Sequence, residues 1–190
     1  MVVVGASPKR RTPSRVWTYA DYCRLDDDQR VEVLEGELSP MYPGPDLGHQ
    51  DTVGALYTRM KVYSDAGHLG RVVIAPFDVI LDDRNVVQPD VIFVSKGRQE
   101  ILKERGVFGA PDLVVEVISP SSLSRDRNRK RKLYARFGVR EFWIVDRRNE
   151  SIEVFVLRQG EYELHSFAAE KGLVKSSVMK GFSLNLADLV

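Results

Sequence analysis

The sequence predicts an α/β fold in which a mixed β-sheet is flanked by helices. Three observations predict it: a helix-like stretch precedes a run of short strand-like stretches, one strand–helix–strand unit follows, and the chain closes with an alternating pair of strands. A strand–helix–strand unit joins parallel strands and tight turns join antiparallel ones, so both directions are expected in the sheet. The 190 residues fit a single domain, which we expect over residues 16–190.

The first third of the chain predicts a basic arm, a short helix, a hairpin and a longer helix. Residues 1–15 lack hydrophobic periodicity and contain basic residues and prolines, which indicates a flexible arm. Thr18 can cap a short helix, and the residues over 30–41 predict a hairpin with a Glu-Gly turn. From His49 onward, apolar residues recur at helical spacing and predict one amphipathic helix.

Strands dominate the rest of the chain. The runs that predict strands before the middle helix are 71–75, 77–81, 86–94 and 113–119. The middle helix is expected over 121–137 and ends at Gly138. The runs that predict strands after it are 142–145, 152–157 and 162–167, with a short strand or helix near 182–189. The run 113–119 is apolar on both faces except at Glu116, as in a strand buried at the centre of a sheet.

Composition excludes several classes of protein. The formal net charge of +1 gives no overall attraction to a polyanion, so any nucleic-acid site must be local. A single cysteine, Cys23, cannot form an intramolecular disulfide, which favours a reducing compartment, and we expect the cytoplasm. No stretch reaches the ~20 apolar residues that cross a bilayer, and the N-terminal charges follow the apolar residues rather than precede them. We therefore expect neither a membrane-spanning nor an exported protein.

Two acidic residues stand near the ends of predicted strands. Pro89 is tolerated at the start of a strand but not in mid-sheet, which places Asp90 near a strand end. Alternation puts Glu116 on the same face as Val114 and Ile118, so its carboxylate must be paired, protonated or bound to metal. Two carboxylates on neighbouring strands can hold Mg²⁺ together with several waters. Such an ion polarises a phosphoryl oxygen and activates an attacking water, as phosphodiester hydrolysis requires.

The predicted middle helix carries a dense group of basic residues. Seven residues between positions 124 and 136 are basic, and Asp126 is the only acid there. Asp126, Lys130 and Tyr134 are spaced i, i+4, i+8 and share one side of the helix, which begins next to the strand of Glu116. This position favours contacts between the basic group and nucleic-acid phosphates. The residues that we assign to these contacts are Arg127, Arg131 and Lys132.

Several motifs together match one known family. They are the strings Gln88-Pro89-Asp90, 116–121 and 138–146, with the i, i+4, i+8 spacing on the helix. In these motifs the chain resembles the Uma-two family of restriction-endonuclease-like proteins, which is similar to the PD-(D/E)xK nuclease superfamily. The resemblance extends from about residue 19 to about residue 156 and so covers most of the chain.

The resemblance implies a restriction-endonuclease-like fold and a metal-dependent nuclease site. Asp90 matches the motif aspartate of the superfamily and Glu116 its second acid, so both are expected to bind Mg²⁺ or Mn²⁺. The superfamily has lysine two residues after the second acid, where this chain has Ile118. In the Uma-two pattern the lysine comes from the following helix, and Lys130 occupies that position. A lysine stem is long enough to reach back, whereas Lys132 points about 200° away around the helix.

Further acidic residues are candidates for supporting roles. Asp78 is a third metal ligand, a support for Lys130 or an exposed edge residue. One member of the pair Glu32 and Glu37 approaches the site, unless both belong to a solvated hairpin. Asp126 shares the side of the helix on which Lys130 lies and is a candidate to support it.

The candidates also have simpler interpretations. Asp90 alone would be a turn residue, Glu116 a member of a buried structural ion pair, and Lys130 part of a solvated charged helix face. His49 either orients substrate or only caps its helix. Tyr134 is interpreted as a packing residue whose hydroxyl bonds a group of the site.

Two hypotheses of function follow. The first is a Mg²⁺- or Mn²⁺-dependent DNA endonuclease that acts as a homodimer, because cutting both strands commonly needs two sites. Asp90 and Glu116 bind the metal, and Lys130 assists the water or the phosphate. The second is a nucleic-acid-binding or protein-interaction module that kept the fold without turnover, which the displaced lysine supports.

Overall fold

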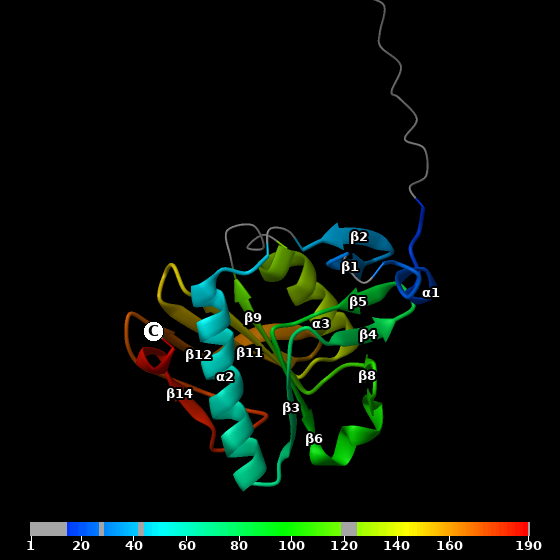
Figure 1. The fold of residues 1–190 in the computed structure, drawn as a ribbon. Coiled ribbons are helices and arrows are strands. Elements are labelled where there is room, and N and C mark those ends of the chain that lie inside the picture. The colour runs from blue at the N-terminus through cyan, green and yellow to red at the C-terminus, as the bar shows by residue number, and fades with distance from the viewer. Residues whose placement is uncertain (1–14, 27–28, 42–43, 119–124, 190) are drawn as a thin grey trace, which may run out of the picture.

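The chain folds into two six-stranded mixed β-sheets, a small two-stranded sheet and helices packed against them (Figure 1). The structure, a computed structural model, describes residues 15–26, 29–41, 44–118 and 125–189. Residues 1–14, nearly all of the expected arm, lie outside this described part, and so do residues 119–124, where the predicted middle helix begins. The predicted α/β class with parallel and antiparallel strands is confirmed, but the strands divide between two large sheets rather than one.

The first sheet contains six short strands in the order β2-β1-β5-β4-β8-β7. Their bounds are β1 Val31–Leu34, β2 Glu37–Pro40, β4 Asp78–Asp82, β5 Asn85–Val87, β7 Leu102–Lys103 and β8 Gly106–Phe108. β1 and β2 form the predicted hairpin, and Glu35 and Gly36 at its turn have φ angles of 55° and 79°. Positive φ at both central residues is typical of a two-residue hairpin turn and explains the glycine.

The second sheet has the order β12-β11-β10-β9-β6-β3. Its strands are β3 Gly70–Ile74, β6 Val91–Ser95, β9 Leu113–Ile118, β10 Glu141–Asp146, β11 Ser151–Arg158 and β12 Glu161–Ala169. β9 and β10 are parallel, as their connection through the middle helix predicts, and the other pairs are antiparallel. Every residue of β9 is buried, so the prediction of a central buried strand is confirmed.

The segment Gln88-Pro89-Asp90 passes the chain from one sheet to the other. The sequence predicted one strand over 86–94, and the structure corrects this to β5 and β6 in different sheets. Pro89 has no N–H to donate to a ladder, so the strand cannot continue through it. The interruption places Asp90 directly before β6, at the junction of the two sheets.

Helices cover both faces of the second sheet (Figure 1). α2, Leu47–Ala66, packs its buried face against one side, and the predicted amphipathic helix is confirmed with a start slightly earlier than His49. The other side is covered by a π-helical segment, η2 Arg125–Lys130, followed by α3, Arg131–Phe137. Gly138 ends α3 with a φ of 81°, as predicted, but residues 125–130 of the expected α-helix are wound as a π-helix.

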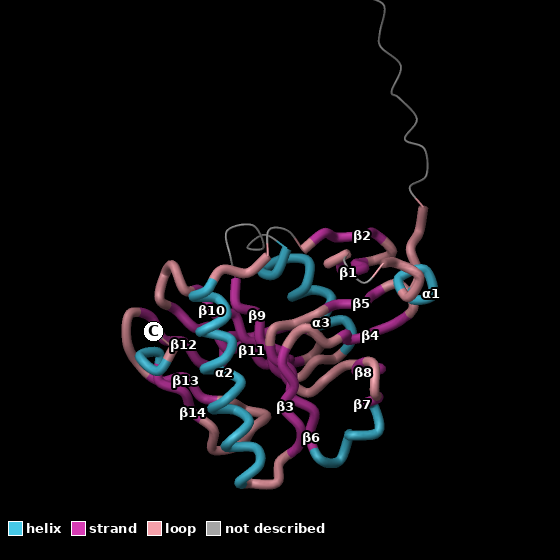
Figure 2. The backbone as a smooth tube through the Cα atoms, in the orientation of Figure 1, coloured by secondary structure: helices cyan, strands magenta, loops and turns pink. Residues whose placement is uncertain are grey.

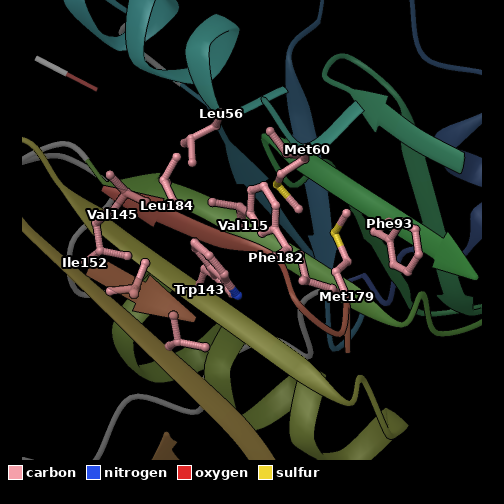
Figure 3. Packing of buried hydrophobic residues seen from close by; sticks show 14 of the residues in the cluster. Leu56, Met60, Phe93, Val115, Trp143, Val145, Ile152, Met179, Phe182 and Leu184 are labelled. Atoms are coloured by element: carbon pink, nitrogen blue, oxygen red, sulfur yellow. The ribbon is translucent and has the colours of Figure 1, made fainter. Parts of the chain in front are cut away.

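The remaining elements are short. They are α1 Tyr19–Tyr22, η1 Lys96–Ile101, β13 Leu173–Lys175, β14 Ser183–Asn185 and η3 Leu186–Asp188, all traced in Figure 2. Thr18 caps α1 through a capping box with Asp21, as its sequence predicted. Figure 3 shows Leu184 and Phe182 of the C-terminal segment beside Leu56 of α2 and Trp143 of β10. The C-terminal segment therefore shares the α2 side of the second sheet.

Candidate active site

Strand register brings Asp90 opposite Glu116. β6 and β9 are antiparallel with Val91 paired to Val115, so the residue before Val91 faces the residue after Val115. The backbone N–H of Val117 donates to Asp90 Oδ2 at 2.7 Å, which fastens the Asp90 carboxylate to β9. The two acids that the sequence singled out are thus neighbours at the end of the second sheet.

Glu116 lies in a buried polar group rather than among apolar side chains alone. Its side chain is only 5% exposed. Lys130 Nζ donates to Glu116 Oε1 at 2.9 Å, and the Tyr134 hydroxyl donates to the same oxygen at 2.6 Å. The lysine therefore reaches back from η2 to the strand, and the expected bond from Tyr134 to a group of the site is present.

Lys130 is surrounded by three carboxylates. Besides Glu116, its Nζ lies 2.7 Å from Glu32 Oε1 and 3.6 Å from Asp126 Oδ1. The Lys130 side chain is only 2% exposed. The side chains of the three acids are 5% exposed or less. We call Lys130 with Glu32, Asp126, Glu116 and Tyr134 the Lys130 cluster. It joins β1 of the first sheet to β9 of the second through a side chain of η2.

The Lys130 cluster is rich in acid. Burial alone would lower the pKa of Lys130, but the negative charges of Glu116, Glu32 and Asp126 outweigh burial and raise that pKa above its ordinary value. Burial raises the pKa of Glu116 well above its ordinary value, and the neighbouring acids add to the rise although Lys130 opposes it. Glu116 is therefore surrounded by other acids as well as by Lys130, and these surroundings favour a proton or a cation near its carboxylate.

Tyr134 stays a hydrogen-bond donor in this environment. Its side chain is fully buried against Phe142. Burial raises the pKa of Tyr134 well above its ordinary value, and the charge of Glu116 adds to the rise. The protonated hydroxyl holds Glu116 Oε1 in place, so Tyr134 positions the acid.

Glu32 is the member of the cluster to which the sequence interpretation gave too little weight. It was expected in a hairpin, with solvation as the simpler alternative, but all four residues of β1 are buried. A signal existed, because Glu32 stands among Val31, Val33 and Leu34 as the only polar residue of an apolar run. The same signal identified Glu116.

The other supporting candidates lie around the cluster at different distances. Glu37 is at the surface, where its carboxylate lies 3.2 Å from Arg129 Nη2. Asp78 is linked to Lys130 through Gln88 and Glu32, because its Oδ1 accepts hydrogen bonds from the Tyr22 hydroxyl at 2.9 Å and from Gln88 Nε2 at 2.8 Å. Within the described residues, neither Glu37 nor Asp78 therefore contacts Lys130, Glu116 or Asp90 directly.

His49 faces Asp90 instead of capping its helix. The N-cap of α2 is Asp46, whose Oδ1 accepts the backbone N–H of His49 at 2.7 Å. The His49 ring lies with Nε2 at 3.5 Å from Asp90 Oδ2 and 3.0 Å from the carbonyl oxygen of Val117. Burial tends to lower the pKa of His49, but the interaction with Asp90 outweighs it and raises that pKa.

Two of the three basic residues assigned to phosphate contacts already have partners within the chain. Arg127 pairs with Glu153 at 2.5 Å, and the Arg131 guanidinium lies 4.5 Å over the Phe155 ring and donates to a backbone oxygen. Lys132 is exposed to solvent. Of the three, Lys132 is the one whose charge the structure presents freely to solvent.

The residues present fit a divalent ion only in part. Among the residues that the structure describes, no three or more Asp, Glu, His or Cys side chains are arranged to hold a metal ion. One reason is that the Lys130 ammonium lies among the carboxylates and takes the place of a cation. Asp90 and Glu116 still offer oxygen ligands on adjacent strands, which suits a hard ion that keeps most of its waters.

Comparison with known proteins agrees with the fold and the motifs. A putative nuclease belonging to DUF820 from Anabaena variabilis has a similar structure, with a TM-score of 0.75 at 18% sequence identity, and the match covers 90% of this chain and 96% of that one. The shared fold is restriction-endonuclease-like. No curated protein matches the chain. No helix in the described ranges combines the length and apolar character needed to cross a membrane. Residues 18–187 match the model of the Uma2 family, described as "Putative restriction endonuclease", and the chain belongs to that family.

Proposed function

We propose that the protein is a Mg²⁺- or Mn²⁺-dependent DNA endonuclease that hydrolyses phosphodiester bonds. The observation that carries the proposal is the buried pair of Glu116 and Lys130, set among further acids beside Asp90 at the end of β9. Family membership supports a nuclease, and restriction-endonuclease-like families generally use divalent metals.

The proposed division of roles follows from the contacts of each residue. Asp90 and Glu116 would hold the ion, which when bound polarises a phosphoryl oxygen and lowers the pKa of a water. Val117 N–H fixes Asp90, and Tyr134 fixes Glu116, so both carboxylates are held before substrate arrives. The Lys130 ammonium beside Glu116 would stabilise negative charge on the phosphate or orient the water.

The proposal also covers the partner of the protein. DNA is the expected substrate, and a homodimer would supply the two sites that cutting both strands commonly needs. Lys132 is exposed and would contact phosphate without reading sequence, which makes binding dependent on salt concentration. The single Cys23 is exposed and suits a reducing compartment such as the cytoplasm.

A second candidate function is a nucleic-acid-binding or protein-interaction module without turnover. The observation that favours it is the enclosure of Lys130, whose ammonium is held by carboxylates on three sides and is almost fully shielded from solvent. In this arrangement the lysine neutralises the protein's own acids. It would have to leave at least one of them to contact a phosphate directly.

The experiment is cleavage of supercoiled plasmid by the purified full chain with Mg²⁺ or Mn²⁺. Glu116→Gln and Lys130→Met are compared with matched substitutions of exposed residues that have no role in the proposal, Glu163→Gln and Lys175→Met. We expect wild type and Glu163→Gln to nick equally and Glu116→Gln to lose roughly a hundredfold or more, as is typical of a lost group that stabilises the transition state. Equal nicking by wild type and Glu116→Gln would contradict the proposal, and binding without cleavage in either metal would favour the second candidate.

A further inference from the structure

A continuous set of hydrogen bonds links the N-terminal helix α1 to Lys130. It runs from the Tyr22 hydroxyl and Asp78 to the side chain of Gln88, and from the backbone of Gln88 to Glu32. Glu32 then pairs with Lys130. Tyr22, Asp78 and Gln88 have no part in the proposed chemistry.

The side chain of Gln88 is fixed by two acceptors. Its Nε2 donates to Asp78 Oδ1 at 2.8 Å and to the Tyr22 hydroxyl oxygen at 3.1 Å. The Tyr22 hydroxyl in turn donates to the same Asp78 oxygen at 2.9 Å. The three groups form a closed triangle, so the side chain of Gln88 has one favoured position.

The backbone of Gln88 serves the Lys130 cluster directly. Its N–H donates to Glu32 Oε1 at 2.9 Å, and this oxygen lies 2.7 Å from Lys130 Nζ. Pro89 cannot donate, so the N–H of Gln88 is the last backbone donor before Asp90 in this segment. The position of one peptide group therefore governs the oxygen that Lys130 contacts.

The location of Gln88 makes this link effective. It stands between β5 and β6, where the chain crosses from the first sheet to the second, two residues before Asp90. Anchoring Gln88 to Tyr22 and Asp78 fixes the crossing segment from outside the site. Both sides of the site, Glu32 with Lys130 and Asp90, depend on that segment.

We propose that Gln88 is a positioning residue that acts on Lys130 through Glu32, with Tyr22 and Asp78 as its anchor. Its side-chain amide holds the crossing segment, its N–H orients Glu32, and Glu32 keeps Lys130 against Glu116. The catalytic consequence rests on the proposed function, because Lys130 matters to cleavage only in a nuclease. The geometric consequence, the shielding of Lys130, does not depend on cleavage.

The test measures how fast Lys130 reacts with an amine-acylating reagent in the full chain, with Lys132 as internal reference and peptide mass spectrometry as readout. Lys130 is buried and Lys132 is exposed, so wild type should label Lys132 far faster. In Gln88→Ala we expect the Lys130-to-Lys132 ratio to rise roughly fivefold to tenfold, as local opening follows the loss of hydrogen bonds. Gln50→Ala, an exposed glutamine of α2, should leave the ratio unchanged.

Tyr22→Phe is a second variant that tests the proposal if Gln88→Ala does not fold. It removes only the hydroxyl that completes the triangle, so the ratio should rise in the same direction but less. An unchanged ratio in a folded Gln88→Ala, or in Tyr22→Phe if that is the folded variant, would overturn the assignment. A similar rise in Gln50→Ala would also overturn it, because the loosening would then not be specific.

The same variants separate this inference from the proposed function. If wild type cleaves plasmid, Gln88→Ala should lower kcat with little change in KM, since substrate contacts remain. If wild type does not cleave but Lys130 becomes reactive in Gln88→Ala, the endonuclease proposal fails and the positioning role stands. If wild type cleaves and the labelling ratio does not change, the positioning role fails alone.

Discussion

Two buried carboxylates of one segment, Asp112 just before β9 and Glu116 within it, have opposite surroundings. Asp112 Oδ1 accepts from the guanidinium groups of Arg98 at 2.6 Å and Arg140 at 2.5 Å, and its Oδ2 accepts the backbone N–H of Ser95 at 2.6 Å. Burial tends to raise the pKa of Asp112, but these donors outweigh it and lower that pKa. The pKa of Glu116 moves in the other direction.

The difference shows how a structural acid can be told from a candidate catalytic acid. At Asp112 two cations and a backbone donor serve one carboxylate, so its charge is satisfied and fastens the start of β9 to η1. In the Lys130 cluster three carboxylates lie around the Lys130 ammonium, and the pKa of Glu116 is raised. A carboxylate with a raised pKa among other acids can respond to a metal ion or a proton, whereas the lowered pKa of Asp112 shows that its charge is already satisfied.

The largest effect on stability is expected at Lys130. Lys130→Met leaves Glu32, Asp126 and Glu116 buried without their ammonium, and breaking such a pair costs about 3–5 kcal/mol. The free energy of unfolding, measured by urea denaturation at neutral pH, should fall by that amount. Lys132→Met on the exposed face should change it by less than about 0.5 kcal/mol. Equal effects of the two substitutions would show that Lys130 is not held by the cluster.

A smaller loss is expected at Asp112. Asp112→Asn removes the charge that two arginines share, but these side chains are 37% and 54% exposed and can recover water, so the cost should be about 2 kcal/mol. The pKa of Asp112 is lowered on folding, so its contribution is complete above the ordinary value of 3.8 and is lost as pH falls through the lower folded value. Denaturation between neutral and strongly acidic pH should therefore show the Asp112→Asn deficit shrinking only at the acidic end.

The fold could be predicted from the sequence wherever local chemistry decides it. The capping Thr18, the Glu-Gly turn, the stop at Gly138 and the lone acid of β9 each carry a local signal that the structure repeats. The division into two sheets could not be predicted as readily, because apolar residues lie on both sides of Gln88-Pro89-Asp90 and no local pattern shows that they pair in different sheets. β7 and β8 were missed because each is only a few residues long and is defined by its pairing rather than by its pattern.

The candidate site was also predictable only where a local sequence signal marks a residue. Burial of a charge within an apolar strand identified Glu116 before its partners were known. Glu32 was underestimated because its burial comes from a partner, Lys130, that lies far away in sequence. The direction of the Lys130 side chain depends on the π-helical winding of η2, which no local sequence pattern predicted. Tertiary contact, not local preference, decides these residues.

The smallest effect on stability is expected at Glu116. Glu116→Gln keeps the shape and an acceptor for Lys130 and Tyr134, so the free energy of unfolding near neutral pH should change by less than about 1 kcal/mol. The pKa of Glu116 is raised on folding, so its contribution is complete below the ordinary value of 4.5 and is lost as pH rises through the folded value. Glu116→Gln should therefore gain relative to wild type as pH increases. A growing loss with pH would mean that the ionised carboxylate is the favoured form and would contradict the raised pKa of Glu116.

The central claim is that the acid-rich surroundings of Glu116, and not buried acid in general, make a metal site. Isothermal titration of the full chain with Mn²⁺ tests it most directly, without DNA or turnover. Wild type and Asp112→Asn should bind the ion alike, while Glu116→Gln and Asp90→Asn should bind at least about tenfold more weakly, as expected for altered ligands of a metal site. No binding by wild type, or equal binding by wild type and Glu116→Gln, would contradict the account.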